Sequence, residues 1–198
     1  VLQDLITHGQ YTQFGRKYGY SEIFTIRKFK ETVPIHEYQD LKPYIDQIMD
    51  GEESVLWNTP VGWFAKSSGT TNDKSKFIPI TEESLSYNHF QASKDVLSMY
   101  YNFNPESDLL TGKGLLIGGS HQINNFNNDS YYGDLSAVMI KNMPFWTDFK
   151  RTPAKDIALL PEWEEKIEKI ANITIKENVT SIAGVPSWTM VLLKRILE

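Results

Sequence analysis

The sequence predicts an α/β domain in which a mixed sheet is flanked by helices. Short apolar runs typical of buried strands alternate with longer segments whose apolar residues recur every three or four positions, as in helices. Clusters of Gly, Pro, Asn and Asp separate these segments. The apolar fraction is 40% of 198 residues, which is enough for a sizeable core. Disorder is therefore not expected.

The first third of the chain is expected to contain short helices with breaks between them. The clearest of these helices covers residues 36–49, because four apolar residues fall on one face near a spacing of 3.6: Tyr38, Leu41, Ile45 and Ile48. Asp50-Gly51 is a suitable helix stop.

Two extended segments follow, over residues 61–66 and 76–80, with a polar loop from Ser67 to Ser75 between them. Thr81 is a suitable N-cap for a helix, because its hydroxyl can accept a hydrogen bond from a backbone N–H group of the first turn. That helix is expected to bury one stripe, made of Leu85, His89, Ala92, Val96, Met99 and Phe103.

The second half of the chain continues the alternation of strands and helices. Residues 113–118 read as a buried strand, and the Asn-rich piece from 124 to 130 reads as a loop. Pro161 is expected to open a helix. A strand over 179–183, a turn at 184–186 and a final helix from 187 to the end complete the prediction.

The composition excludes several classes of function. The formal net charge is −5, whereas nucleic-acid binders usually have a basic excess, so no nucleic-acid partner is expected. The chain has no cysteine, which rules out disulfides, thiolate zinc sites and cysteine nucleophiles within it. There is neither an apolar run of 18 residues nor a signal-peptide pattern, so no membrane contact and a cytoplasmic location are expected.

The most informative segment runs from Ser67 to Lys76. It contains Gly69, four hydroxyl side chains among its first five residues, and two lysines, Lys74 and Lys76. A triphosphate needs close backbone N–H groups, which glycine permits, together with hydroxyl donors and a balancing cation. The same residue types are ordinary in polar hairpin loops, so composition alone leaves that alternative open.

This segment is not a Walker loop. Asp73 precedes Lys74 where that motif needs glycine, and the residues that follow look extended and not helical. The expected geometry is therefore a strand–loop–strand flap that covers phosphates, and not a cradle at a helix N-terminus.

The order of residues 67–71, followed by Lys74, resembles the phosphate-binding motif of the adenylate-forming superfamily. That superfamily includes acyl-CoA synthetases, luciferases and peptide-synthetase adenylation domains. Residues 63–81 are more closely similar to the auxin-responsive family of acyl-acid amido synthetases, in its bacterial form. Residues 7–44 and 115–121 are similar to that family too, and residues 184–188 resemble the turn that borders the acyl pocket of acyl-CoA ligases.

The resemblance implies a ligase that uses ATP and Mg²⁺ to activate a carboxylic acid as its acyl-adenylate, with release of pyrophosphate. The acyl group then passes to an amine, usually that of an amino acid, to form an amide. Five residues would line the β- and γ-phosphates: Ser67, Ser68, Gly69, Thr70 and Thr71. Lys74 matches the lysine of the motif, and Lys76 is a second candidate. Asn72-Asp73 replaces the glycine usual in the superfamily, and both residue types tolerate left-handed backbone.

Three further residues are candidates for an acyl-substrate pocket. Ser120 and His121 follow a Gly-Gly strand end, a place where ligands often bind in α/β folds. Trp188 follows the Gly184-Val185-Pro186 turn. The structural alternatives are a histidine that only stabilises a turn and a tryptophan that belongs to the core. No His/carboxylate spacing typical of a metal site occurs, so no metal ligands are expected from side chains.

The chain, residues 1–198, is expected to be the N-terminal portion of the large adenylation domain, and to be inactive alone. Both ends look like cuts, since residues 1–6 already read as helix and the last residues contain no helix stop signal. A thiol acceptor, another NTP-using enzyme and a non-catalytic binding domain stay open as alternatives. The catalytic residues, the acyl acid and the oligomeric state are not predicted.

Overall fold

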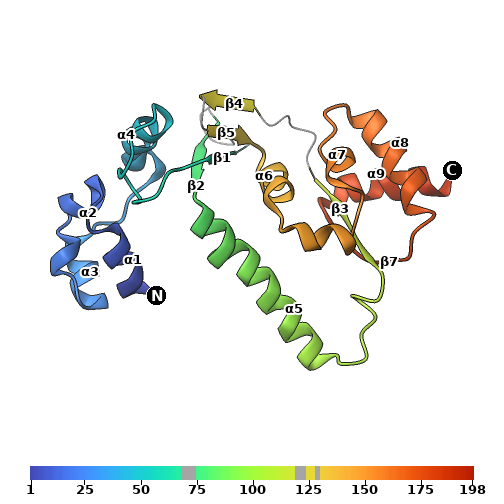
Figure 1. Cartoon of the computed structure of the whole chain (residues 1–198), viewed down its shortest axis with the longest axis horizontal. Coiled ribbons are helices and arrows are strands. Elements are labelled where there is room, and N and C mark those ends of the chain that lie inside the picture. Colours follow the sequence, from blue (N-terminus) through green and yellow to red (C-terminus); the bar gives the residue numbers. More distant parts are fainter. Residues whose placement is uncertain (68–74, 119–123, 128–129) are drawn as a thin grey trace.

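The computed structural model describes residues 1–67, 75–118, 124–127 and 130–198. Within these ranges the strands form two sheets, one with the order β2-β1-β5-β4 and the other with the order β6-β3-β7 (Figure 1). The strands are β1 (Trp63–Lys66), β2 (Phe77–Ile80), β3 (Lys113–Ile117), β4 (Asn124–Asn127), β5 (Ser130–Gly133), β6 (Arg151–Thr152) and β7 (Val179–Gly184). The predicted α/β class is confirmed, although the strands divide between two small sheets.

Short helices form the N-terminal part, as predicted, and they gather on one side of the molecule (Figure 1). They are α1 (Leu2–Gly9), α2 (Gln13–Lys17), the 3₁₀ helix η1 (Tyr20–Glu22), α3 (Ile26–Thr32) and α4 (Tyr38–Met49). Thr12 and Thr25 begin α2 and α3, because their hydroxyls accept from backbone N–H groups three residues later. Gly51 follows α4 with a φ of 95°, the left-handed conformation that ends a helix.

The four-stranded sheet is centred on β1. This strand pairs antiparallel with β2 and parallel with β5, while β4 lies antiparallel to β5 at the edge. Neighbouring residues of β1 face opposite sides of the sheet. Phe64 packs with Ile48 of α4, and Ala65 packs with Val138 of α6 (Leu135–Asn142). Helices therefore cover both faces of this sheet.

The three-stranded sheet is parallel throughout, with β3 between β6 and β7. Helices α8 (Trp163–Thr174) and α9 (Pro186–Leu197) pack against it and enclose an apolar cluster. Its buried members are Leu115, Ile117, Ile167, Ile170, Ala171 and Leu192. The 3₁₀ helix η3 (Phe145–Phe149) and the short helix α7 (Lys155–Ala158) lie on either side of β6 in the chain.

The long helix after Thr81 differs from its prediction. The Thr81 hydroxyl accepts from Ser84 N at 3.1 Å, as expected of an N-cap, and the chain continues as the π-helix η2 (Ser84–Phe90) and α5 (Gln91–Phe103). Leu85 is buried, but Val96, Met99 and Phe103 are 66%, 61% and 75% exposed. The predicted buried stripe is therefore wrong for α5, and His89 is also only partly buried. Figure 1 gives the reason: α5 runs along the outside of the molecule, away from both sheets.

Two other boundaries need correction. Residues 124–127 were expected to be a loop but form β4, which pairs with β5 through Asn124–Tyr132 and Asn125–Tyr131. Backbone pairing at a sheet edge outweighs the low strand propensity of asparagine there. Helix α8 begins at Trp163 with Glu162 as its N-cap, so Pro161 precedes the helix.

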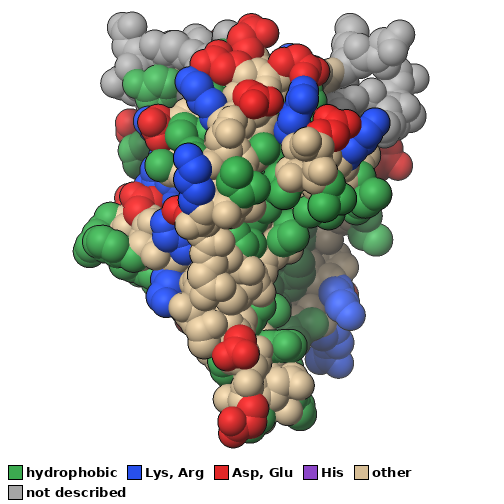
Figure 2. Space-filling model, turned by 90° about the vertical axis from the view of Figure 1, so that its right-hand side faces the viewer, with side chains coloured by type: hydrophobic (Ala, Val, Ile, Leu, Met, Phe, Trp, Pro, Cys, Tyr) green, Lys and Arg blue, Asp and Glu red, His purple; other side chains and the backbone are tan. Residues whose placement is uncertain are grey.

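The side of the molecule that carries α8 and α9 shows acidic and basic side chains interspersed with apolar ones (Figure 2). Ion pairs of α8 and α9 join Lys169 with Glu165 at 2.6 Å and Arg195 with Glu168 at 3.4 Å. Among the described residues, no helix is both long and apolar enough to cross a membrane.

Candidate functional site

The predicted phosphate loop is flanked by β1 and β2. Residues 68–74 lie outside the described ranges, so Ser68, Gly69, Thr70, Thr71 and Lys74 are not placed. The flanks are placed: Lys66 pairs with Phe77, and Ser67 N donates to the Lys76 carbonyl oxygen at 2.8 Å. Lys76 N donates in turn to Ser67 Oγ at 3.2 Å. The chain therefore enters and leaves this segment at one point, at the end of an antiparallel pair of strands.

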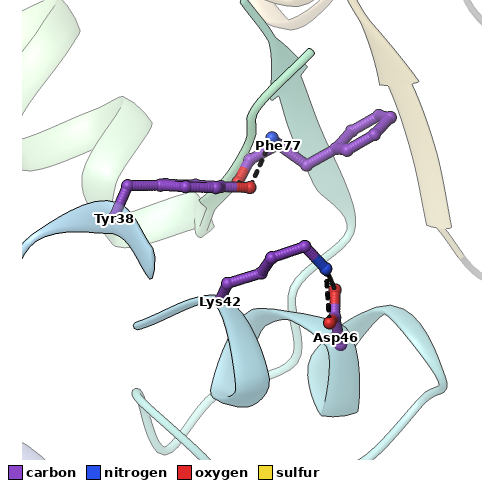
Figure 3. Close-up of polar contacts among 4 residues, drawn as sticks. All are labelled: Tyr38, Lys42, Asp46 and Phe77. Atoms are coloured by element: carbon purple, nitrogen blue, oxygen red, sulfur yellow. Dashed lines mark hydrogen bonds and ion pairs between the residues drawn. The ribbon is translucent and has the colours of Figure 1, made fainter. Parts of the chain in front are cut away.

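A tyrosine of α4 fixes the base of this hairpin. The Tyr38 hydroxyl accepts from Phe77 N at 3.0 Å and lies 3.3 Å from the Phe77 carbonyl oxygen, to which it donates (Figure 3). One side chain thus satisfies both backbone groups of the first residue of β2. Sequence reasoning missed this role, because the partners are 39 positions apart and no local pattern links them.

Tyr38 also contacts the second candidate lysine. Lys76 Nζ lies 5.3 Å from the centroid of the Tyr38 ring, which is within the range of a cation–π contact. Lys42 and Asp46 form a separate ion pair one turn further along α4, with Nζ 2.7 Å from Oδ1 (Figure 3). The structure therefore places Lys76 at the base of the hairpin, and Ser67 beside it.

The second group of predicted residues follows the ends of β3 and β7. These strands are parallel and Ile117 pairs with Gly184, so Gly118 and Val185 lie at the same edge of the sheet. A Cβ atom at Gly184 would lie 3.0 Å from Ile117 Cβ and 3.2 Å from the Ile117 carbonyl oxygen, so only glycine fits without displacement. Ser120 and His121 lie outside the described ranges.

Gly118 contacts a helix from each of the two sheets. A Cβ atom there would lie 2.6 Å from Cδ1 of Ile140 on α6, the helix that follows β5. The Gly118 carbonyl oxygen also accepts a hydrogen bond from Nζ of Lys166 on α8 at 2.9 Å. The end of β3 is therefore held between helices that belong to different sheets.

Lys166 is fully buried. Loss of hydration lowers the pKa of its ammonium from 10.5 to about 8, although the nearby Asp134 carboxylate acts in the opposite direction. Asp134 is the N-cap of α6 and accepts from Ser136 N at 2.8 Å. Neither Lys166 nor Asp134 was among the site residues predicted from the sequence. A lysine within an amphipathic helix gives no sequence signal that it is buried.

Trp188 lies in the first turn of α9 and is half-buried. Its ring centroid is 5.6 Å from that of Trp163 on α8, with an interplanar angle of 55°. It packs beside the apolar cluster of the parallel sheet. The structure therefore brings Trp188 into the helical layer that covers this sheet, close in the chain to the Gly184 turn.

Comparison with known proteins settles the family. The model of the GH3 family N-terminal domain matches residues 1–198. The chain belongs to the GH3 family. The resemblance to acyl-acid amido synthetases noted from the sequence is thereby confirmed at the level of the family.

Similar proteins from plants carry related names. The chain is 32% identical over 125 residues to a jasmonoyl–L-amino acid synthetase, JAR4 of Nicotiana attenuata, which covers 62% of the chain and 21% of that protein. It is 34% identical over 86 residues to the indole-3-acetic acid-amido synthetase GH3.2 of Arabidopsis thaliana. This match covers 43% of the chain and 16% of that protein. The matched segments thus span about a fifth of the length of the first relative and about a sixth of the second.

Solved GH3 structures share the fold. A GH3.15 acyl acid amido synthetase matches with a TM-score of 0.74 and 21% identity, over 99% of the chain and 35% of that structure. The same enzyme in complex with 2,4-DB matches with a TM-score of 0.76 and 21% identity, over 98% of the chain and 34% of that structure. At this identity the comparison shows the fold alone.

Proposed function

We propose that the chain forms the N-terminal part of the large domain of an ATP-dependent acyl-acid amido synthetase. Membership of the GH3 family supports the enzyme class, and the names of the plant relatives describe transfer of an acyl acid to an amino acid. The observation that carries the proposal is the β1–β2 hairpin, which holds both ends of the segment from Ser67 to Lys76 at one point.

The proposed reaction has two steps. A carboxylate oxygen of the acid attacks the α-phosphorus of ATP, and the bond from that phosphorus to the β-bridging oxygen breaks, so pyrophosphate leaves. The amine nitrogen of the acceptor then attacks the acyl carbon, the bond to AMP breaks, and the amine loses a proton. Both steps depend on positioning and on neutralising negative charge more than on covalent chemistry by side chains.

In this proposal the hairpin covers the triphosphate. Ser67, Ser68, Gly69, Thr70 and Thr71 give hydroxyl and backbone donors to the β- and γ-phosphates, and Lys74 gives the cation. Lys76 gives a second cation to the phosphates, once its ammonium has left the cation–π contact with the Tyr38 ring. Mg²⁺ would be held by the phosphate oxygens and would supply further neutralisation of their charge.

The acyl pocket is proposed at the C-terminal edge of the parallel sheet. Ser120 and His121 follow Gly118, and Trp188 follows the Gly184 turn, so both segments start from this edge. Ligands of α/β folds bind beyond the carboxyl ends of parallel strands. The acid and the amine acceptor are small molecules, and the plant names identify candidate classes for the first assays: oxylipin and indole acids.

Product analysis tests the transfer step. The full-length protein that carries this chain is incubated with ATP, Mg²⁺, a panel of such acids and an equimolar mixture of amino acids and coenzyme A. Mass spectrometry should show an acid–amino acid amide, which disappears in Ser68→Ala and Lys74→Ala and persists in Lys28→Ala, an exposed lysine of α3. Formation of a thioester alone would contradict the amide assignment.

A further inference from the structure

A cavity of about 250 Å³ lies at the other end of the parallel sheet, where β3 and β6 begin. Six polar or charged residues line it: Lys113, Asp148, Arg151, Thr152, Lys155 and Glu177. Residues of α7 and α8 provide the apolar part of the wall. Since Gly118 follows the opposite end of β3, and Gly184 ends the parallel neighbour β7, the cavity is separate from the proposed acyl pocket.

Arg151 is the central feature of this cavity. Its side chain is 3% exposed, and its Nε donates to Asp148 Oδ1 at 2.7 Å. Its Nη1 and Nη2 atoms are buried and have no hydrogen-bond partner among the residues the structure describes. Buried, unsatisfied donors of a charged group are costly, so a ligand that accepts from both atoms is strongly favoured. The planar guanidinium matches two oxygens of a phosphate or carboxylate.

The charges of the cavity favour an anion. Lys113, Arg151 and Lys155 contribute three positive charges, whereas Asp148 and Glu177 contribute two negative ones. Lys113 Nζ is bonded to Glu177 Oε1 at 2.5 Å, and Lys155 Nζ lies 4.0 Å from Asp148 Oδ1. Because Arg151 and Lys155 share the single carboxylate of Asp148, one positive charge of the cavity is left unbalanced.

The carboxylate of Glu177 favours a phosphate over a carboxylate as the ligand. Glu177 Oε2 is buried, and the Thr152 hydroxyl, which helps to lower the pKa of this carboxyl, is a donor beside it in the cavity wall. A ligand oxygen that approaches this carboxylate must carry a proton, which an ionised carboxylate ligand lacks. A hydrogen phosphate ion or a phosphoryl group with one O–H can accept from Arg151 and donate to Glu177. We propose that this cavity is a binding site for a small phosphate-type oxyanion, distinct from the site of ATP.

Calorimetric titration of the full-length protein with inorganic phosphate tests the site. Ionic strength is held constant with chloride, and a small phosphomonoester such as glycerol phosphate forms a parallel arm. Arg151→Lys is expected to weaken phosphate binding by about tenfold, and Lys155→Gln by about threefold. Lys176→Gln is the matched control, because it removes one charge from an exposed neighbour of Glu177 that does not line the cavity.

Two further arms separate this site from the proposed ATP site. Lys74→Ala should leave phosphate binding at the cavity unchanged, since that lysine belongs to the hairpin segment. Acetate at the same ionic strength should not compete with phosphate. Should Arg151→Lys fail to fold, as judged by circular dichroism, Lys155→Gln carries the test. Absence of millimolar binding, or equal weakening by Lys176→Gln and Lys155→Gln, would overturn the proposal.

Discussion

Lys166 of α8 donates a hydrogen bond from Nζ to the carbonyl oxygen of Gly118 across 2.9 Å, although its side chain is completely buried. The bond ties α8 to Gly118, the residue that follows β3. Ile140 of α6 packs against the same glycine. The end of β3, from which the proposed acyl pocket starts, is therefore fixed by groups from both halves of the molecule.

The buried ammonium of Lys166 makes stability depend on pH. Its pKa in the folded protein is about 8, below the value of 10.5 in the unfolded chain, so between these pH values the unfolded chain binds more protons. The free energy of unfolding contributed by this lysine therefore rises from pH 8 to pH 10.5, by on the order of 3 kcal/mol. Below pH 8 the full cost of burying the charge is present.

Denaturant unfolding of the wild type and of Lys166→Met at pH 7.5 and pH 10 measures this effect. The difference in unfolding free energy between them should move in favour of the wild type at the higher pH. Lys169→Met, which changes a half-exposed lysine of the same helix, is the matched control and should not show the same change. A constant difference for Lys166→Met would contradict the burial of a charged lysine at this position.

Removal of the Tyr38 hydroxyl should loosen the base of the hairpin. Tyr38→Phe leaves Phe77 N and the Phe77 carbonyl oxygen without this partner, and is expected to cost about 1–3 kcal/mol of unfolding free energy. Because the hairpin is proposed to cover the triphosphate, the Kd for ATP should rise as well. Chemical denaturation and equilibrium ATP binding measure the two effects.

The control for Tyr38→Phe lies on the same helix. Asp46→Asn breaks the ion pair with Lys42, but both side chains are almost half exposed, at 48% and 46%. An exposed pair separated by one helical turn contributes about 0.5 kcal/mol or less. Asp46→Asn should therefore change stability little and leave ATP binding as it is. A similar loss in both variants would show that the Tyr38 hydroxyl has no special role.

The contact between Gly118 and Ile140 can be tested by a double-mutant cycle. Gly118→Ala places a methyl group 2.6 Å from Ile140 Cδ1 and is expected to cost about 1–3 kcal/mol of stability. Ile140→Val removes that Cδ1 atom and costs about 1 kcal/mol alone. The double variant should be more stable than the sum of the two losses predicts, by about 1 kcal/mol. Strict additivity would mean that these residues do not touch.

Local patterns were sufficient to predict most elements near the candidate site. The strands around residues 67–75, the N-cap at Thr81 and the strand ending near Gly118 follow from alternation, capping chemistry and glycine position, which are local properties. The strand pairing of β1 with β5 could not be predicted in this way, because the partners are more than 60 residues apart and β5 has no strong strand pattern of its own.

The errors have a common physical origin in long-range contacts. The apolar spacing of α5 predicts an amphipathic helix, but periodicity cannot say whether anything in the same chain covers the apolar face, and here Val96, Met99 and Phe103 are exposed. The Asn-rich strand β4 is formed by pairing with β5 and not by its own composition. The roles of Tyr38 and Lys166 depend on partners 39 and 48 positions away.

Acid-dependent exchange of labelled pyrophosphate into ATP tests the central claim most directly, because it requires reversible formation of an acyl-adenylate and needs no acceptor. The account predicts exchange by the full-length protein only when a suitable carboxylic acid is present. Lys74→Ala and Ser68→Ala should lose most of this exchange, whereas Lys28→Ala should retain it. Exchange that is independent of any acid, or that persists unchanged in both loop variants, would contradict the assignment of the segment between β1 and β2 as the phosphate loop of an adenylating enzyme.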